Sequence, residues 1–381
     1  MNDLLLEQVR DRLARTGAPP SETAVARAVR DLGAVMGPES VLGLARRLRD
    51  DLVGTGPLEP LLADPRVSDV VVNGPHQVFV DRGSGLEPGG VRFSDAEEVR
   101  RLAVRLAGAA GRRLDDAVPW VDAALPDGTR LHAVLPPIAP DGPLLSLRVL
   151  GHRTPDLADL VATGSVPEVL LPTLRQVIEQ RLSFLVTGGT GVGKTTVLGA
   201  LLSLVDPRER LVLVEDTREL APRHPHAVRL VTRAPNVEGA GEVGLDDLVR
   251  QALRMRPDRL VVGEVRGREV VDLLAALNTG HEGGCGTVHA NASRDVPARL
   301  EALGLAAGLD RSAVHSQVAA GLHLVLHLTR TRGRRRLSEV AVVTRCDEHV
   351  AVEAGTVVDP GGRVRPGPGA DRLAAVLQGR A

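Results

Sequence analysis

Aromatic residues are scarce in this chain of 381 residues, which contains three Phe, one Trp and no Tyr. Proteins that bind single-stranded nucleic acid stack the bases on aromatic side chains, so this composition weighs against that class. The formal net charge of -1 provides no long-range attraction to nucleic acid or to anionic lipid either. We therefore expect no nucleic-acid partner.

Long apolar runs and closely spaced cysteines are also missing. No segment approaches the roughly eighteen uninterrupted apolar residues that a membrane-spanning helix needs, so no transmembrane segment is expected. Asp3 and Glu7 stand where a signal peptide would carry basic residues. Cys285 and Cys346 are far apart and indicate no disulfide framework. These features predict a protein of the reducing cytoplasm.

Lysine occurs only once, at Lys194, because arginine accounts for the other 46 residues of the 47 Lys and Arg. An ammonium is a compact point charge, whereas a guanidinium is a broad planar fork. Coding bias with one chance survivor would explain the count. The position of Lys194 inside the phosphate motif described below favours a chemical requirement instead.

The pattern of apolar residues predicts an α/β protein with several parts. β-type runs such as SFLVTG and RLVVGEV alternate with helical segments in the C-terminal half, which is typical of a mainly parallel sheet. A smaller α+β domain is predicted before it, from short strands and one capped helix. The expected parts are N-terminal helices over 1–53, the α+β domain over 54–150, a linker over 151–170, the α/β domain over 171–345 and a C-terminal tail over 346–381. The stretch DPGGRVRPGPG in the tail is predicted to be loosely ordered.

The stretch GGTGVGKT matches the phosphate-loop pattern G-x-x-x-x-G-K-[ST] and lies between a predicted strand and a predicted helix, as that motif requires. Its glycines allow backbone N–H groups to point at phosphates, and the helix N-terminus adds favourable potential. Lys194 is expected to reach the terminal phosphates, and Thr195 to offer its hydroxyl to Mg²⁺. The sequence predicts a nucleotide site that comprises Gly188, Gly189, Thr190, Gly191, Val192, Gly193, Lys194, Thr195 and Thr196.

Acidic residues follow two of the predicted strands. Glu215 and Asp216 end the run LVLVED, and Glu264 ends RLVVGEV. Parallel-sheet enzymes gather their ligands at the carboxyl ends of strands. Hydrolysis needs a group that positions or activates water and a second anchor for the metal, and these acids are candidates for both. The run RLVVGEV resembles a Walker B element, in which Asp is common before the acidic residue; here Gly263 stands before Glu264. A solvated strand end is the alternative for either acidic site alone, and two such sites beside a phosphate loop disfavour it.

Three potential metal ligands, His281, Cys285 and His289, recur at intervals of four residues. Zinc is not favoured, because glycines interrupt the spacing and neither a fourth ligand nor a Cys-x-x-Cys pair is present. His289 follows an apolar strand and is a candidate to hydrogen-bond a phosphate. A buried core histidine is an equal alternative on the sequence alone.

The remaining arginines carry weaker signals. The basic stretch RTRGRRR is predicted to form a hairpin tip around Gly333; it could hold phosphate or acidic lipid, but a solvated tip is the favoured interpretation. Arg130 and Arg148 lie in the predicted α+β domain, where the sequence by itself would make them surface charges.

Six segments, taken in chain order, resemble a known family: GPLEPLLADPRVSDVVVNG, GRRLDDAVPWVDAALPDGTRLHAVLPP, GGTGVGKTT, LVEDTREL, ALRMRPDRLVVGEVRGREVVDLLAALNTGHEGGCGTVHAN and ARLEAL. They look very much like the bacterial type II/type IV secretion ATPase superfamily. Within it, the TadA/CpaF ATPases of tight-adherence (Flp) pilus assembly are the nearest in pattern. The resemblance covers roughly residues 54–343, and no tetracysteine zinc module of the type II exporters is present.

This resemblance implies ATP and Mg²⁺, a RecA-like P-loop C-terminal domain, a separate N-terminal domain and a ring of six subunits with ATP between the two domains. Lys194 and Thr195 match the family's Walker A motif, Glu264 its Walker B motif and His289 its His box. The Asp box corresponds to Glu215 and Asp216. Arg130 and Arg148 correspond to arginines of the N-terminal domain that approach the phosphates. Glu264 is expected to activate water and Glu215 to position metal and water, although these roles could be exchanged.

The chain departs from the family pattern at two positions. Ala124 stands where the family often has arginine, which puts one contact of the N-terminal domain in doubt. His323 stands where an acidic residue is common before the late strand. The sequence offers no account of it.

The leading hypothesis is a cytoplasmic ATPase, peripheral to the inner face of the cytoplasmic membrane, whose homo-hexamer drives a pilus or secretion platform protein of that membrane. A DNA or conjugation translocase shares the same motifs, and low aromatic content weighs against it. The third hypothesis is a non-hydrolysing nucleotide-dependent scaffold. The presence of Glu215, Glu264 and His289 disfavours it.

Overall fold

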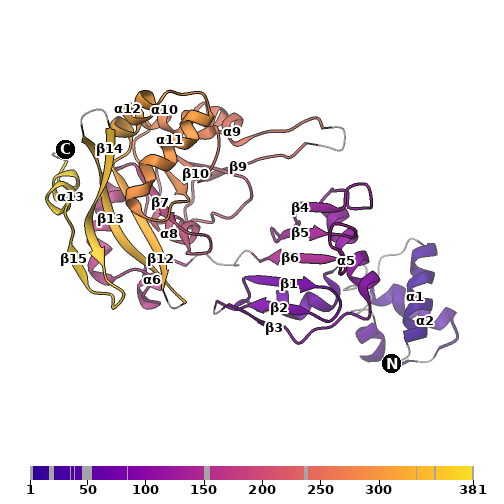
Figure 1. Ribbon diagram of the computed structural model, residues 1–381. Coiled ribbons are helices and arrows are strands. Elements are labelled where there is room, and N and C mark those ends of the chain that lie inside the picture. Colours follow the sequence, from indigo (N-terminus) through magenta and orange to yellow (C-terminus); the bar gives the residue numbers. More distant parts are fainter. Residues whose placement is uncertain are drawn as a thin grey trace. The chain divides into compact units, whose positions relative to one another are not determined.

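The computed structural model describes residues 3–16, 21–34, 36–37, 39–44, 54–83, 85–149, 155–235, 239–331, 333–346 and 349–379. The chain divides into two compact units, Met1–Gly151 and His152–Ala381 (Figure 1). Each unit contains its own sheet and its own apolar core.

Helices α1 (Asp3–Thr16) and α2 (Glu22–Asp31) begin the first unit. Ser21 caps α2, because its hydroxyl accepts a hydrogen bond from the backbone N–H of Ala24. The helices pack together through a small core of Val9, Leu13, Val25, Ala28, Val29 and Leu44. The described parts of the expected helical segment over 1–53 are therefore largely helical, and residues 45–53 lie outside the described ranges.

An antiparallel six-stranded sheet forms the rest of the first unit, in the order β3-β2-β1-β6-β5-β4. Short helices η1 (Gly56–Leu58) and α4 (Glu59–Leu62) precede it. Its strands are β1 (Asp69–Asn73), β2 (Val78–Asp81), β3 (Leu86–Pro88), β4 (Trp120–Ala124), β5 (Arg130–Val134) and β6 (Leu144–Arg148).

Helix α5 (Ala96–Ala109) covers one face of this sheet. Its buried stripe packs against every second side chain of the strands, since successive residues of a strand point to opposite faces. The polar side chains of β1, β5 and β6 therefore lie together on the other face.

The second unit is built on a nine-stranded sheet in the order β15-β14-β13-β12-β7-β11-β10-β8-β9. The strands from β12 to β9 in this order are parallel, and the other three are antiparallel additions at one edge. The bounds are β7 (Phe184–Gly188), β8 (Leu211–Glu215), β9 (Ala227–Val231), β10 (Arg259–Val265), β11 (Cys285–Val288), β12 (Leu324–Thr331), β13 (Arg334–Cys346), β14 (His349–Val358) and β15 (Val364–Pro366).

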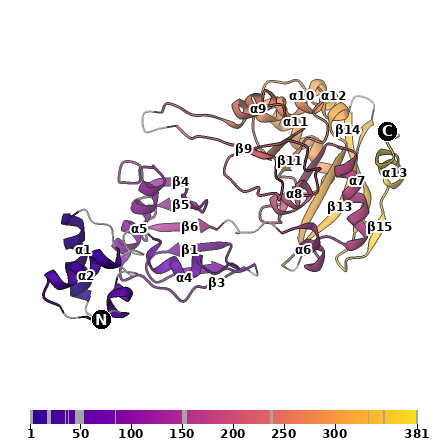
Figure 2. The same ribbon diagram turned by 180° about the vertical axis from the view of Figure 1, so that it is seen from behind.

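Helices cover both faces of this sheet, as Figures 1 and 2 show. One face carries α6 (Leu157–Ala162), α7 (Leu171–Glu179), α8 (Lys194–Leu202) and α13 (Ala370–Leu377). The other carries α9 (Leu245–Leu253), α10 (Glu269–Leu277), α11 (Val296–Ala306) and α12 (Arg311–Gly321). Strands β7 and β8 are buried along their whole length, as a parallel sheet between two helical layers requires. The predicted RecA-like α/β domain with a smaller α+β domain is confirmed.

The structure corrects the expected linker over 151–170. From Asp156 onward this segment belongs to the second unit, where α6 and the short helix η2 (Glu168–Leu170) contribute Leu157, Leu160 and Leu170 to the core beneath α8. Its Pro and Gly content suggested a linker. Its leucines are spaced to bury one side of two short helices, and burial prevails.

The expected tail over 346–381 is also corrected, because β14, β15 and α13 complete the sheet and bury Val358, Leu373 and Val376. The stretch DPGGRVRPGPG forms β15 and the turn before α13 rather than a loose segment. A Cβ at Gly367 would collide with the carbonyl oxygen of Ala354. This glycine is present because two backbones meet there, which composition alone cannot distinguish from disorder.

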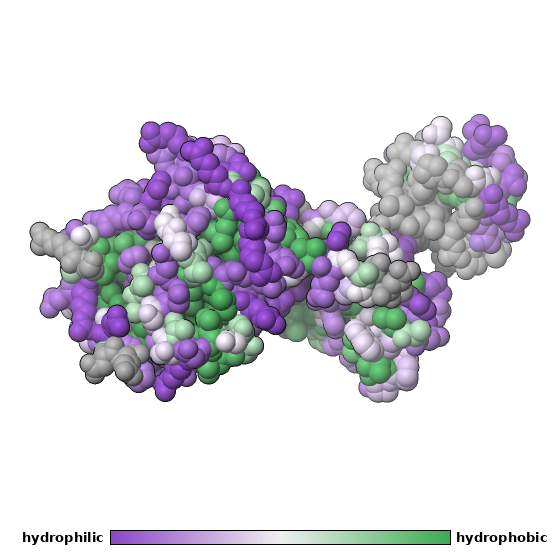
Figure 3. Space-filling model, turned by 90° about the horizontal axis from the view of Figure 1, so that it is seen from above, coloured by the Kyte–Doolittle hydropathy of each residue, from purple (hydrophilic) through white to green (hydrophobic). Residues whose placement is uncertain are grey.

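Among the described residues, no helix is both long and apolar enough to cross a membrane. Figure 3 shows hydrophilic residues interspersed with hydrophobic ones over the visible face.

Candidate active site

The phosphate loop connects β7 to α8, as the motif predicted. Gly188, the last residue of β7, has φ 144°, and a Cβ there would collide with the carbonyl of Leu328 on the adjacent strand. Gly193 precedes α8 with φ 93° in the left-handed region, which glycine adopts without strain. Both glycines are therefore required by backbone geometry. The loop ends at a helix N-terminus, where anions are favoured.

Lys194, the single lysine, is buried at the start of α8 with 8% of its surface exposed. Its Nζ donates hydrogen bonds to the carbonyl oxygens of Gly188 at 3.1 Å and Gly189 at 2.9 Å. These contacts hold the ammonium on the loop itself. A guanidinium would need more room in this buried position, which gives a physical reason why arginine has not replaced it.

His289 and Glu264 meet beside Lys194. Nε2 of His289 lies 2.6 Å from Oε1 of Glu264, and Nδ1 lies 3.3 Å from Nζ of Lys194. Burial and the charge of Lys194 lower the pKa of His289, against an opposing contribution from Glu264. The imidazole is therefore neutral near pH 7, and the contacts assign Nε2–H as donor to Glu264 and Nδ1 as acceptor from Lys194.

Glu215 ends β8 and is 2% exposed. Its Oε1 accepts hydrogen bonds from the backbone N–H groups of Glu219 at 3.0 Å and Leu220 at 2.7 Å. The other oxygen, Oε2, is buried and has no partner among the described residues. Desolvation raises the pKa of Glu215 to about 7, while the two N–H groups act in the opposite direction.

Gly263, on the neighbouring strand β10, leaves room for Glu215. A Cβ on Gly263 would lie 3.0 Å from Cγ of Glu215. The carbonyl oxygen of Gly263 accepts a hydrogen bond from Thr287 Oγ1 at 2.7 Å. The glycine that stands before Glu264, in place of the more common Asp, is thus explained by the buried carboxyl of the adjacent strand.

Two residues of the site were not proposed from the sequence. Glu219 accepts a hydrogen bond from Thr195 Oγ1 at 3.4 Å, and Arg266 forms an ion pair with Asp216 at 2.5 Å. Glu219 could have been proposed, because it follows Glu215 by four residues in the quoted segment LVEDTREL. Arg266 has no comparable signal, since its role depends on β8 and β10 lying side by side.

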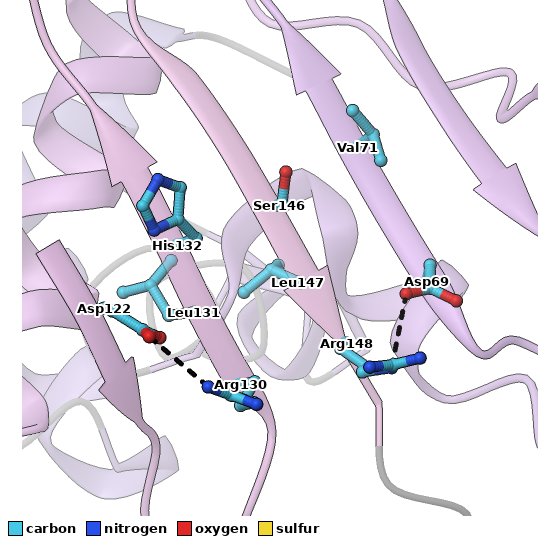
Figure 4. A pocket seen from close by; sticks show the side chains of 9 residues that line it. All are labelled: Asp69, Val71, Asp122, Arg130, Leu131, His132, Ser146, Leu147 and Arg148. Atoms are coloured by element: carbon cyan, nitrogen blue, oxygen red, sulfur yellow. Dashed lines mark hydrogen bonds and ion pairs between the residues drawn. The ribbon is translucent and has the colours of Figure 1, made fainter. Parts of the chain in front are cut away.

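In the first unit, Arg130 and Arg148 line a hollow of about 330 Å³ on the sheet face opposite α5 (Figure 4). They are cross-strand partners on β5 and β6, with carboxylates beside them. Arg130 Nη2 lies 3.4 Å from Asp122 Oδ2, and Arg148 Nε lies 3.8 Å from Asp69 Oδ1.

The two departures from the expected pattern have distinct settings. Ala124 is exposed and lies opposite Arg130 in the register of β4 and β5. His323 Nδ1 accepts a hydrogen bond from the backbone N–H of Ser183 at 3.1 Å, which joins the starts of β12 and β7. His323 therefore has a structural role here. The zinc hypothesis gains no support, because Cys285 is buried in the core beneath α8.

The fold and these contacts define a P-loop nucleotide-binding protein of the RecA-like class. The chain belongs to the family described as Type II/IV secretion system protein, which matches residues 51–363. It is an ATPase of this family of secretion and conjugation motors. The family match does not distinguish the expected TadA/CpaF branch from the other secretion and conjugation ATPases.

The chain is 58% identical over 323 residues to a Mycobacterium tuberculosis protein provisionally named a conjugal transfer protein, covering 83% of this chain and 92% of that protein. It is 32% identical over 302 residues to the conjugal transfer protein TrbB of Rhizobium radiobacter, covering 78% and 89%.

Among solved structures, the Legionella pneumophila ATPase DotB has a TM-score of 0.53 at 19% identity and covers 75% of this chain and 79% of its own. The pilus retraction motor PilT with bound ADP has a TM-score of 0.53 at 18% identity and covers 85% of each chain. At these identities the structures support the fold.

Proposed function

We propose that the chain is the ATP-hydrolysing subunit of a ring-shaped motor. The observation that carries this proposal is that His289 contacts both Lys194 and Glu264 beside the phosphate loop. Lys194 follows the loop after β7, Glu264 lies at the end of β10, and His289 follows β11. A phosphate held by the loop would lie next to an ammonium, a neutral imidazole and a carboxylate. That combination provides charge stabilisation and a base for water.

Glu264 is proposed to activate the attacking water. It is partly exposed and hydrogen-bonded to His289, whereas Glu215 is buried and turned onto the backbone of the loop that follows β8. His289 contacts both Lys194 and Glu264, and we propose that it responds to a phosphate bound next to either of them. Glu215 is proposed to position metal and water, in keeping with its unsatisfied buried oxygen.

The residues around Thr195 fit Mg²⁺, a cation that prefers oxygen ligands. The hydroxyl of Thr195 lies next to the carboxylate of Glu219, and Asp216 follows Glu215 at the same strand end. When bound, Mg²⁺ would supply charge neutralisation on the phosphates. Thr195 is proposed as a direct ligand, with Glu215 and Asp216 acting through water.

Arg130 and Arg148 are proposed to approach the phosphates from the N-terminal unit and to couple its movement to hydrolysis. Their support is local: both guanidinium groups lie on the open face of the sheet and line the same hollow. Phosphate oxygens would have to replace the carboxylates of Asp122 and Asp69 as the partners of these two guanidinium groups.

The assembly is proposed to be a homo-hexamer in the cytoplasm, at the inner face of the cytoplasmic membrane. Its partner would be a membrane platform protein of a TadA/CpaF-like Flp pilus or secretion system. The family is the support for this setting, since its members act as oligomers with membrane secretion systems.

A second candidate function is a motor of conjugal DNA transfer. The names of relatives at 58% and 32% identity favour it. The scarcity of aromatic residues and the net charge of -1 weigh against direct contact with DNA. A conjugation motor could act on the membrane channel without touching DNA, so the two candidates differ in their membrane partner.

ATP turnover by Glu264→Gln tests the catalytic proposal. We expect a loss of at least 100-fold in kcat, about the contribution of a positioned general base, with MgADP binding retained. Turnover at the wild-type rate would remove Glu264 from catalysis. If the wild-type protein itself shows no turnover, with or without its membrane partner, the non-hydrolysing scaffold is favoured.

Co-purification from native membranes tests the setting. Recovery of an integral pilus platform protein would support the first candidate. A conjugation channel, or stimulation of turnover by added DNA, would support the second.

A further inference from the structure

The tip of the hairpin between β12 and β13 extends past the start of the phosphate loop. Leu328 of β12 lies beside Gly188 in the sheet register. At Gly188 the chain turns into the phosphate loop, whereas β12 continues to Thr331. The described hairpin residues beyond Leu328, 329–331 and 333–336, therefore lie outside the end of β7, next to the loop.

Arg330 and Arg335 lie on the side of this hairpin that carries α8. They are cross-strand partners, so their side chains share one face. Arg330 follows Leu328 by two residues and Arg335 precedes Leu337 by two, and both leucines belong to the core beneath α8. A Cβ placed on Gly193 would lie 3.8 Å from Cδ of Arg335. Arg335 thus adjoins Gly193, the residue that precedes α8.

The charge of this pair is not balanced within the described part of the chain. Arg330 and Arg335 are exposed, and neither guanidinium makes a hydrogen bond or an ion pair with another described residue. Like charges directly opposite each other on two strands are destabilising. An anion between the two arginines would remove that repulsion.

Other arginines of the protein in similar settings do have partners. Arg336, next along β13, donates hydrogen bonds to the carbonyl oxygens of Asp359 at 3.1 Å and Pro360 at 2.8 Å. In the first unit, the cross-strand pair of Arg130 and Arg148 is accompanied by two carboxylates. Arg330 and Arg335 thus differ from these arginines, because no acceptor among the described residues contacts either guanidinium.

We propose that Arg330 and Arg335 bind a phosphate group of the nucleotide held on the phosphate loop, as cationic contacts from the same unit in addition to Lys194. This inference rests on the proposed function and extends its binding site to the hairpin. A guanidinium offers paired N–H donors that match phosphate oxygens. An anionic phospholipid headgroup shares this chemistry, but the position of Arg335 beside Gly193 favours the nucleotide.

The test is the affinity of the full chain for MgADP, measured by titration calorimetry, in Arg330→Ala, Arg335→Ala and the double variant. The control is Arg334→Ala, which removes the same charge from the next position of β13 on the opposite face. We expect each test variant to lose about tenfold in affinity, the size of one hydrogen bond to a charged group. The control should stay within about twofold of wild type. Equal affinities in Arg335→Ala and Arg334→Ala would overturn the proposal.

Two further measurements separate the remaining explanations. Magnesium tripolyphosphate should lose affinity in the double variant as MgADP does, because the contact is to phosphate; unchanged tripolyphosphate affinity would overturn the assignment. Vesicles of phosphatidylglycerol test the other source of phosphate. Vesicle binding that is lost in the double variant while MgADP affinity is unchanged would assign the arginines to lipid and overturn the proposal.

Lys194→Ala distinguishes failure of this inference from failure of the proposed function. If wild type binds MgADP, Lys194→Ala loses it and the arginine variants bind normally, only the hairpin inference fails. If Lys194→Ala binds MgADP as wild type does, the nucleotide site itself is wrong. Folding is monitored by the unfolding midpoint without nucleotide. It should be unchanged or higher in the double variant, because two facing like charges are removed.

Discussion

The buried carboxyl of Glu215 should make one separable contribution to the pH dependence of this protein's stability. This side chain is 2% exposed, and desolvation raises its pKa from 4.5 to about 7. A folded-state pKa above the unfolded value means that the folded protein binds the proton more tightly. The resulting stabilisation is complete below about pH 4.5 and is lost as the pH rises through about 7.

The shift from 4.5 to about 7 corresponds to about 3 kcal/mol of unfolding free energy, at about 1.4 kcal/mol per pKa unit. Glu215→Gln removes the ionisation but keeps a carbonyl oxygen that can accept from the N–H groups of Glu219 and Leu220. The variant should match wild type near pH 4.5. Above about pH 7.5 it should be more stable by about 3 kcal/mol.

The assay is urea unfolding of wild type and Glu215→Gln in parallel from pH 4.5 to 9, followed by far-UV circular dichroism. Nucleotide is omitted and EDTA is present, so that no bound metal stabilises the carboxylate. All other groups titrate alike in the two proteins, so the difference between their unfolding free energies isolates this residue. A difference that does not change with pH, or that favours wild type at high pH, would refute the burial argument.

Three further predictions concern Gly263, His289 and Arg148. Gly263→Ala should destabilise by about 1–3 kcal/mol, because its Cβ would lie 3.0 Å from Cγ of Glu215; thermal unfolding measures this, and a double variant with Glu215→Ala should recover much of the loss. The lowered pKa of His289 means that its neutral form persists below pH 6.5. The acid limb of kcat/KM should therefore lie below pH 6.5 if neutral His289 is needed, and a limb that is absent from His289→Asn would identify it. Arg148→Ala should reduce turnover at least tenfold with little change in the unfolding midpoint, since its pair with Asp69 is 3.8 Å long and partly exposed; normal turnover would show that the arginine does not reach the nucleotide.

The phosphate loop was predictable from the sequence because its physics is local. The glycines, Lys194 and Thr195 are consecutive or nearly so, and the β7 and α8 segments on either side follow from apolar patterning. The alternation of strands and helices likewise predicted a covered, mainly parallel sheet. Glu215 and Glu264 could be named as candidate site residues from the sequence, because each ends a predicted strand. Parallel strands end at the same edge of a sheet, and ligands gather there.

The contacts between those candidates were decided by the order of strands in the sheet. His289 reaches Glu264 and Lys194 because β11 lies between β10 and β7, and nothing in the spacing of these residues along the chain specifies that order. The buried state of Glu215, the need for Gly263 beside it and the position of Arg335 at Gly193 arise in the same way. Composition was misleading in two places. It suggested a linker over 151–170, where Leu157, Leu160 and Leu170 are buried, and a loose segment at DPGGRVRPGPG, where β15 pairs with β14. Local chemistry is determined by neighbours in sequence, whereas burial and pairing depend on residues that only the folded chain brings together.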